Sequence, residues 1–176
     1  MLINKGNSIS QGIEGDNNQQ ALNDIYNIYL PAEVRKVPSN IANLLQGISD
    51  MVDSVTPSEL DIIAFDLRKK VEHNEIVLYR QHFDFYVESM GLIEAKLNIL
   101  VEYDALCREK IIKYIRTKWA TIEASLLPDV RIATLVQLIK NDLLQHSTLN
   151  LEDIEHIPHV IFYVFSECKI FDKPPC

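Results

Sequence analysis

Residues 74–103 read NEIVLYRQHFDFYVESMGLIEAKLNILVEY and contain eight apolar or aromatic side chains at alternating steps of three and four residues. These residues, called the apolar seam below, are Ile76, Tyr79, Phe83, Tyr86, Met90, Ile93, Leu97 and Leu100. A mean step of 3.5 residues places them on one side of a helix, about 37 Å long if unbroken. Other helices must cover a seam of this length, so the stretch predicts an all-α bundle of five or six helices. Gly91 is its weakest position, where a kink or break would split it into two antiparallel helices.

Four further segments have the apolar spacing of helices. Ser39 is expected to cap a helix that ends near Asp53. A second helix over 104–127, with Leu126 on its inner side, should stop at Pro128, because proline interrupts the backbone ladder. Asp129 is expected to cap the third, which runs to 146.

The fourth segment has two parts, one capped by Asn150 and one restarted by Pro158. The second part contains residues 160–165, which are apolar on every face, as in a central buried helix. The segment 56–65 remains open between a helix that starts with a capping box and an extended strand.

Residues 1–36 differ from the rest, because Asn, Gln and Gly crowd positions 6–20 and large apolar groups are sparse. We therefore divide the chain into an N-terminal tail, 1–36, and a helical domain, 37–176. The tail is either a flexible, solvated leader or a short β-forming element, since turn signals flank Ile9 and Ile13. A third possibility is self-association, because ladders of Asn and Gln stabilise strands stacked between chains.

The composition restricts the class of protein. Seventeen Lys and Arg against 25 Asp and Glu give a net charge of -8, which disfavours binding to nucleic acid or to anionic lipid. The three cysteines, Cys107, Cys168 and Cys176, are odd in number and not closely paired, which indicates free thiols and a reducing compartment. The longest apolar run is too short to span a membrane. These features predict a cytoplasmic protein that is not inserted in a membrane.

The sequence contains no phosphate-binding glycine loop, nucleophile elbow or metal-spaced cysteine set. His156, His159 and Cys168 could supply two imidazoles and a thiolate to one zinc ion, but a fourth ligand is missing and Pro158 disturbs the common face of the histidines. We therefore predict no metal, no cofactor and no enzymatic activity.

One helix concentrates positive charge in this acidic chain. Its basic residues are Arg108, Lys110, Lys113, Arg116 and Lys118. They form either a solvated face that balances the charge of acidic neighbours in the same chain or a binding face for an acidic protein partner. Binding of nucleic acid is the least favoured interpretation.

Three stretches resemble the C-terminal module of bacterial ABC-three-component conflict systems, the group that includes Lamassu-type antiphage defences. Residues 65–74, FDLRKKVEHN, are similar to the family's Lys, aliphatic, Glu, aromatic, Asn entry into a long helix. Residues 165–174, FSECKIFDKP, are similar to its Cys-Lys-Ile ending followed by proline. Residues 15–18, GDNN, look like its Asn-rich leader. The resemblance covers residues 55–176 and contains no catalytic signature.

The resemblance implies a helical adaptor that links an effector to an ATPase of the chromosome-maintenance type and keeps the effector silent until infection. It implies a structural role for the motif residues, which are Lys70, Glu72, Asn74, Cys168 and Lys169. Only about 50 residues precede the matching region, too few for a fused effector domain. The effector is then a separate subunit, or the chain is a stand-alone signalling protein that oligomerises through its Asn/Gln-rich tail.

Overall fold

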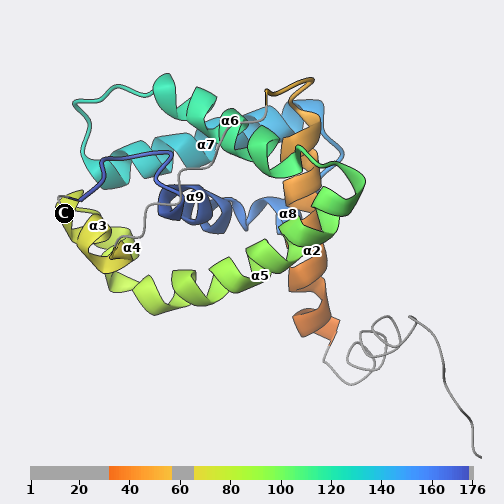
Figure 1. Ribbon diagram of the computed structural model, residues 1–176, viewed down its shortest axis with the longest axis horizontal. Coiled ribbons are helices and arrows are strands. Elements are labelled where there is room, and N and C mark those ends of the chain that lie inside the picture. Colours follow the sequence, from red (N-terminus) through yellow and green to blue (C-terminus); the bar gives the residue numbers. More distant parts are fainter. Residues whose placement is uncertain (1–31, 57–65, 175–176) are drawn as a thin grey trace, which may run out of the picture. The chain divides into compact units, whose positions relative to one another are not determined.

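The computed structural model describes residues 32–56 and 66–174, with side chains from residue 37 onward (Figure 1). Throughout this part of the chain the regular elements are helices, which confirms the all-α prediction. They are α2 (Ala32–Asp50), α3 (Leu67–His73), α4 (Val77–Gln81), α5 (Phe83–Tyr103), α6 (Cys107–Ala120), α7 (Pro128–His146), α8 (Leu151–Ile154) and α9 (Ile157–Ser166). The predictions for the Asn/Gln-rich tail and for residues 57–65 lie outside the described residues.

Helix α9 is the centre of the core. It packs against α5, α6 and α7, and Figure 1 shows it between α5 and α7. Residues 160–165 are buried on all sides, as their uninterrupted apolar run predicts. The Tyr79 ring from α4 lies edge-on to the Phe162 ring with 4.8 Å between their centroids, a favourable aromatic geometry. Residues 157–165 therefore form the surface on which the other helices assemble.

The apolar seam faces α9, but it does not break at the predicted position. Tyr79, Tyr86, Ile93 and Leu97 are buried, and α5 continues through Gly91. The break lies at His82, between α4 and α5. A glycine costs a helix only about 1 kcal/mol relative to alanine, and the buried seam residues on both sides of Gly91 outweigh it.

Helix α6 ends at Ala120, seven residues before the predicted stop. The Thr121 hydroxyl donates a hydrogen bond to the Lys118 carbonyl oxygen at 2.7 Å, and this kind of local bond competes with helix continuation. Ile122 then turns back into the core, whereas Leu126 is 36% exposed. The prediction that Leu126 points inward is therefore wrong.

Two predicted caps are also wrong. Helix α2 begins at Ala32 and contains Pro38, so Ser39 lies inside it and not at its start, and α2 ends at Asp50. Helix α7 has Leu127 at its N-cap, while Asp129 lies within its first turn. The Asp129 carboxylate instead accepts hydrogen bonds from the backbone N–H groups of Val77 and Leu78, both at 2.9 Å. Asp129 thereby caps α4, an element about 50 residues earlier in the chain.

The short helix α8 begins as predicted. The Asn150 side chain accepts a hydrogen bond from the Asp153 N–H at 3.0 Å, and the Asp153 carboxylate accepts one from the Asn150 N–H at 3.0 Å, which completes a capping box. Asp153 also accepts a hydrogen bond from the Asn43 side chain of α2 at 3.1 Å. This buried carboxylate thus fixes the start of α8 and its contact with α2.

Candidate protein-interaction site

Three of the five basic residues of α6 pair with carboxylates of the chain. Arg108 donates a hydrogen bond to the Glu94 carboxylate of α5 at 3.1 Å and contacts the Tyr163 hydroxyl of α9. Its ion pair holds the pKa of the Glu94 carboxyl below its usual value. Lys110 pairs with Asp104 at 2.8 Å and Lys118 with Asp142 at 2.7 Å. These three cations balance the charge of acidic neighbours in the same chain, which agrees with the interpretation of the basic residues as a solvated face.

Lys113 and Arg116 lie together on the exposed side of α6. The Lys113 ammonium donates a hydrogen bond to the Ser54 carbonyl oxygen at 2.8 Å. The Arg116 side chain makes no hydrogen bond or ion pair with any described residue. The structure therefore reduces the predicted basic face to one exposed pair, a helical turn apart, which we call the α6 basic pair.

Two adjoining hollows flank the α6 basic pair. One has a volume of about 490 Å³, and its lining includes both cations, the apolar groups of Val55 and Ile112, and Glu109. One oxygen of the Glu109 carboxylate is buried and has no hydrogen-bond partner among the described residues. The second hollow, of about 380 Å³, shares Lys113 with the first and extends to Asp142. Two cations, apolar groups and a carboxylate thus line one concave region.

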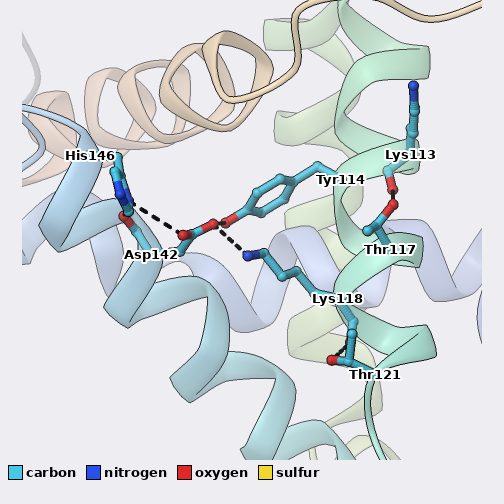
Figure 2. Close-up of polar contacts among 7 residues, drawn as sticks. All are labelled: Lys113, Tyr114, Thr117, Lys118, Thr121, Asp142 and His146. Atoms are coloured by element: carbon cyan, nitrogen blue, oxygen red, sulfur yellow. Dashed lines mark hydrogen bonds and ion pairs between the residues drawn. The ribbon is translucent and has the colours of Figure 1, made fainter.

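A polar network, drawn in Figure 2, includes three residues that line the second hollow, Tyr114, Lys118 and Asp142. The Tyr114 hydroxyl donates a 2.7 Å hydrogen bond to the Asp142 carboxylate, which also accepts from Lys118 and lies 3.4 Å from the His146 ring. Burial and Asp142 together raise the pKa of Tyr114. Burial works against the charged form of Asp142, but the hydrogen bonds from Lys118 and Tyr114 keep its pKa below the usual value. The network therefore fixes α6 against α7, while Lys113 points away from it.

Sequence reasoning missed the part that α7 takes in this site. Asp142 lies 24 residues beyond Lys118, and only the packing of α6 against α7 brings the two together. The available signal is the spacing of Tyr114 and Lys118, which are four residues apart and therefore share one side of a helix. That spacing predicts a shared partner without identifying it.

The motif residues of the family resemblance come together at another place, between α3 and the end of α9. Lys70 is fully buried, and its ammonium donates hydrogen bonds to the carbonyl oxygens of Phe165 and Ile170, the second at 3.2 Å. The Asn74 side chain donates to the Asp172 carbonyl oxygen at 2.9 Å and accepts from the Asp172 N–H at 3.1 Å. Two of the three stretches that carry the resemblance, residues 65–74 and 165–174, thus contact each other.

The other motif residues are less enclosed. Glu72 is exposed, and Lys169 is half-buried. Ile170 and Phe171 beside it suggest that Cys168 is a small buried group, but it is only half-buried. Its backbone is left-handed, with φ of 56°. Its N–H donates to the Phe165 carbonyl oxygen at 3.0 Å, the same oxygen that Lys70 binds. Burial is the main cause that lowers the pKa of Lys70 to about 8.

The histidines considered as metal ligands lie side by side near the start of α9. The ring centroids of His156 and His159 are 5.5 Å apart, and the His159 ring also stacks edge-on against Phe85. Burial lowers the pKa of both histidines. Within residues 32–56 and 66–174, no three His, Cys, Asp or Glu side chains are grouped so as to bind a metal ion.

None of the described helices combines the length and apolar character that a membrane span needs. Comparisons with family models, curated proteins and solved structures found no match to this chain.

Proposed function

We propose that this chain is a non-enzymatic helical adaptor that binds an acidic segment of a protein partner at the α6 basic pair. The observation that carries the proposal is the position of Lys113 and Arg116, exposed beside two adjoining hollows on a chain of net charge -8. In such a chain an exposed basic pair with apolar surface beside it selects partners of opposite charge.

The hollows specify the chemistry of this segment. Carboxylates of the partner pair with Lys113 and Arg116, and its apolar side chains cover Val55 and Ile112. This pattern is that of an acidic amphipathic peptide and not of a nucleic acid.

The resemblance to ABC-three-component modules supports the identity of the partners. On that basis the adaptor operates in the cytoplasm of a bacterium, in a complex with an ATPase of the chromosome-maintenance type and a separate effector. Lys70 and Asn74 are engaged within the chain, consistent with the structural role that the resemblance implies for them.

The test is co-expression of the tagged chain with the products of the genes adjacent to its own. We expect the chain to retain a coiled-coil ATPase, and the double variant Lys113→Glu/Arg116→Glu to lose it. The loss should be larger at low than at high salt, because salt screens exposed charges. The matched control is Lys69→Glu/Arg80→Glu, which makes the same charge change at two exposed positions away from α6.

Two outcomes contradict the proposal. Retention of the ATPase by the Lys113→Glu/Arg116→Glu variant at low salt excludes the α6 basic pair as the binding site. Failure of the unmodified chain to retain any product of the adjacent genes removes the adaptor function itself.

A further inference from the structure

Cys168 lies in a turn that encloses the amine of Lys70. Lys70 donates hydrogen bonds to the carbonyl oxygens of Phe165 and Ile170, so both ends of this turn are bound to the same group. The Lys70 nitrogen also lies 4.1 Å from the centroid of the Phe165 ring. Within the turn, the Cys168 N–H donates to the Phe165 carbonyl oxygen at 3.0 Å, and the Cys168 thiol is in hydrogen-bonding contact with Lys70. The fold thus holds a thiol and an amine side by side, although they come from opposite ends of the helical domain.

The two groups differ in their access to solvent. Lys70 is fully buried, whereas Cys168 is half-buried and therefore open in part to small solutes. Cys107, by contrast, is only 1% exposed. The left-handed backbone of Cys168, with φ of 56°, is unfavourable for a residue other than glycine, so the contacts of the turn and not local preference hold this cysteine in place.

The surroundings of Lys70 give both groups reactive forms. Burial lowers the pKa of Lys70 to about 8, and the other titratable groups that act on it are Cys168, Asp172 and Lys173. About half of the folded molecules therefore carry a neutral amine at pH 8, and a neutral amine is a nucleophile. In the remaining molecules the ammonium group lies beside the thiol, an arrangement that favours the thiolate, which is the form that peroxides oxidise.

We propose that Cys168 and Lys70 form a peroxide-sensitive modification site, in which the oxidised cysteine is captured by the lysine as a sulfenamide. In the first step the Cys168 sulfur attacks one oxygen of hydrogen peroxide. An S–O bond forms, the O–O bond breaks and one water leaves, so the thiol is oxidised to a sulfenic acid and the peroxide is reduced. In the second step the Lys70 nitrogen attacks this sulfur. An N–S bond forms, the S–O bond breaks, and the hydroxyl group leaves as a second water with a proton from the amine.

The product ties α3 covalently to the segment that follows α9 and removes the buried positive charge. Because the link closes a long loop, it restricts the unfolded chain and should raise the midpoint of urea unfolding. Two equivalents of a small thiol reverse the link, since they restore the Cys168 thiol and the Lys70 amine and become a disulfide themselves. The site is separate from the α6 basic pair and does not depend on the function proposed for that pair.

The experiment is treatment of the full chain with hydrogen peroxide at pH 8, followed by mass spectrometry of the intact protein and of its peptides. We expect the mass to fall by about 2 Da, because two hydrogens are lost in total. The peptide map should join the peptide of Lys70 to that of Cys168, and dithiothreitol should separate them. The map is needed because a disulfide causes the same change of mass.

Two variants test the role of the amine. Lys70→Arg keeps the positive charge, but a guanidinium group is always protonated and is no nucleophile, so oxidation should stop at a sulfenic acid that dimedone traps at Cys168. Lys169→Arg is the matched control, because it makes the same change at the neighbouring lysine, and it should still form the link. Circular dichroism should show that both variants keep the helical content of the unmodified chain.

Three results of the peptide map overturn the proposal, and each is obtained with the unmodified chain, whether or not Lys70→Arg folds. The first is a Cys168 thiol that survives peroxide. The second is oxidation of Cys168 to a sulfenic or higher acid while Lys70 stays free. The third is a link from Cys168 to Lys169 or to another cysteine in place of Lys70.

Discussion

Replacement of Lys70 by methionine should remove a pH dependence from the stability of this protein. Lys70 is fully buried in the contact between α3 and the end of α9, and burial lowers its pKa to about 8 from the ordinary value of 10.5. Between these two values the folded chain holds fewer protons than the unfolded chain, in which the lysine is exposed. The free energy of unfolding contributed by this group therefore rises with pH over that interval, starting near pH 8.

The size of the effect follows from the shift. Each pH unit inside the interval changes the free energy of unfolding by about 1.36 kcal/mol, so the 1.5 units from pH 8 to 9.5 correspond to about 2 kcal/mol. Measurement up to pH 9.5 stays below the ordinary pKa of the tyrosines, whose ionisation in the unfolded chain works in the opposite direction. Burial raises the pKa of the Cys107 thiol, but this group is present in every variant and cancels in the comparison.

The assay is urea unfolding at half-unit steps from pH 7 to 9.5, followed by circular dichroism, with the unmodified chain, Lys70→Met and Lys69→Met in parallel. Lys69 is the neighbouring, exposed lysine of α3, so its variant should keep the rise of about 2 kcal/mol. Lys70→Met should show a rise smaller by that amount, whatever its stability at pH 7. Profiles of Lys70→Met and the unmodified chain that run parallel over the whole range would refute the assignment of the buried charge.

Three further predictions concern the core and the caps. Phe162→Ala should lower the free energy of unfolding by about 3–5 kcal/mol, because Phe162 is fully buried against the rings of Tyr79 and Phe165. Phe85→Ala, at a position 59% exposed, should cost much less in the same urea titration. Asp129→Ala should cost about 1 kcal/mol and speed hydrogen exchange of the first two amides of α4, which its carboxylate caps; unchanged exchange there would remove this role. Burial lowers the pKa of His156 and His159, so as the pH drops the unfolded chain takes up protons before the folded chain does. The free energy of unfolding should therefore fall as the pH drops through about 6.5. In thermal melts, the double variant His156→Gln/His159→Gln should lose less stability over this pH range than the unmodified chain.

The apolar spacing predicted the helices and their buried sides better than it predicted where they begin and end. The 3.5-residue repeat of the apolar seam placed Tyr79 and Ile93 correctly in the core. It could not locate the break at His82, because local propensity points to Gly91 and tertiary packing against α9 decides the outcome. The repeat also could not predict that Phe83, at a seam position, is only partly buried.

Caps and charges show a second limit. Asp129 has the residue type and position of an N-cap for α7, and nothing in the local sequence indicates that it binds the start of α4 instead. The five cations of α6 likewise look equivalent along the chain. Arg108 and Lys118 are neutralised by carboxylates of α5 and α7, whereas Arg116 is not paired with any residue of the described part. Pairing between helices depends on their packing, which residue spacing within one helix does not encode.

The contacts of Lys70 and Asn74 explain why two short stretches about 95 residues apart belong to one pattern. Lys70 binds carbonyl oxygens at the end of α9, and Asn74 binds both backbone groups of Asp172. If the C-terminal stretch lost this conformation, the Lys70 ammonium would remain buried without these acceptors, at a cost of several kcal/mol. The two stretches therefore have to occur together, and together they fix the closure of the C-terminal segment onto α3. Since Lys70 and Asn74 are used within the chain, they are not available to a partner, which agrees with our proposal that the α6 basic pair is the binding site.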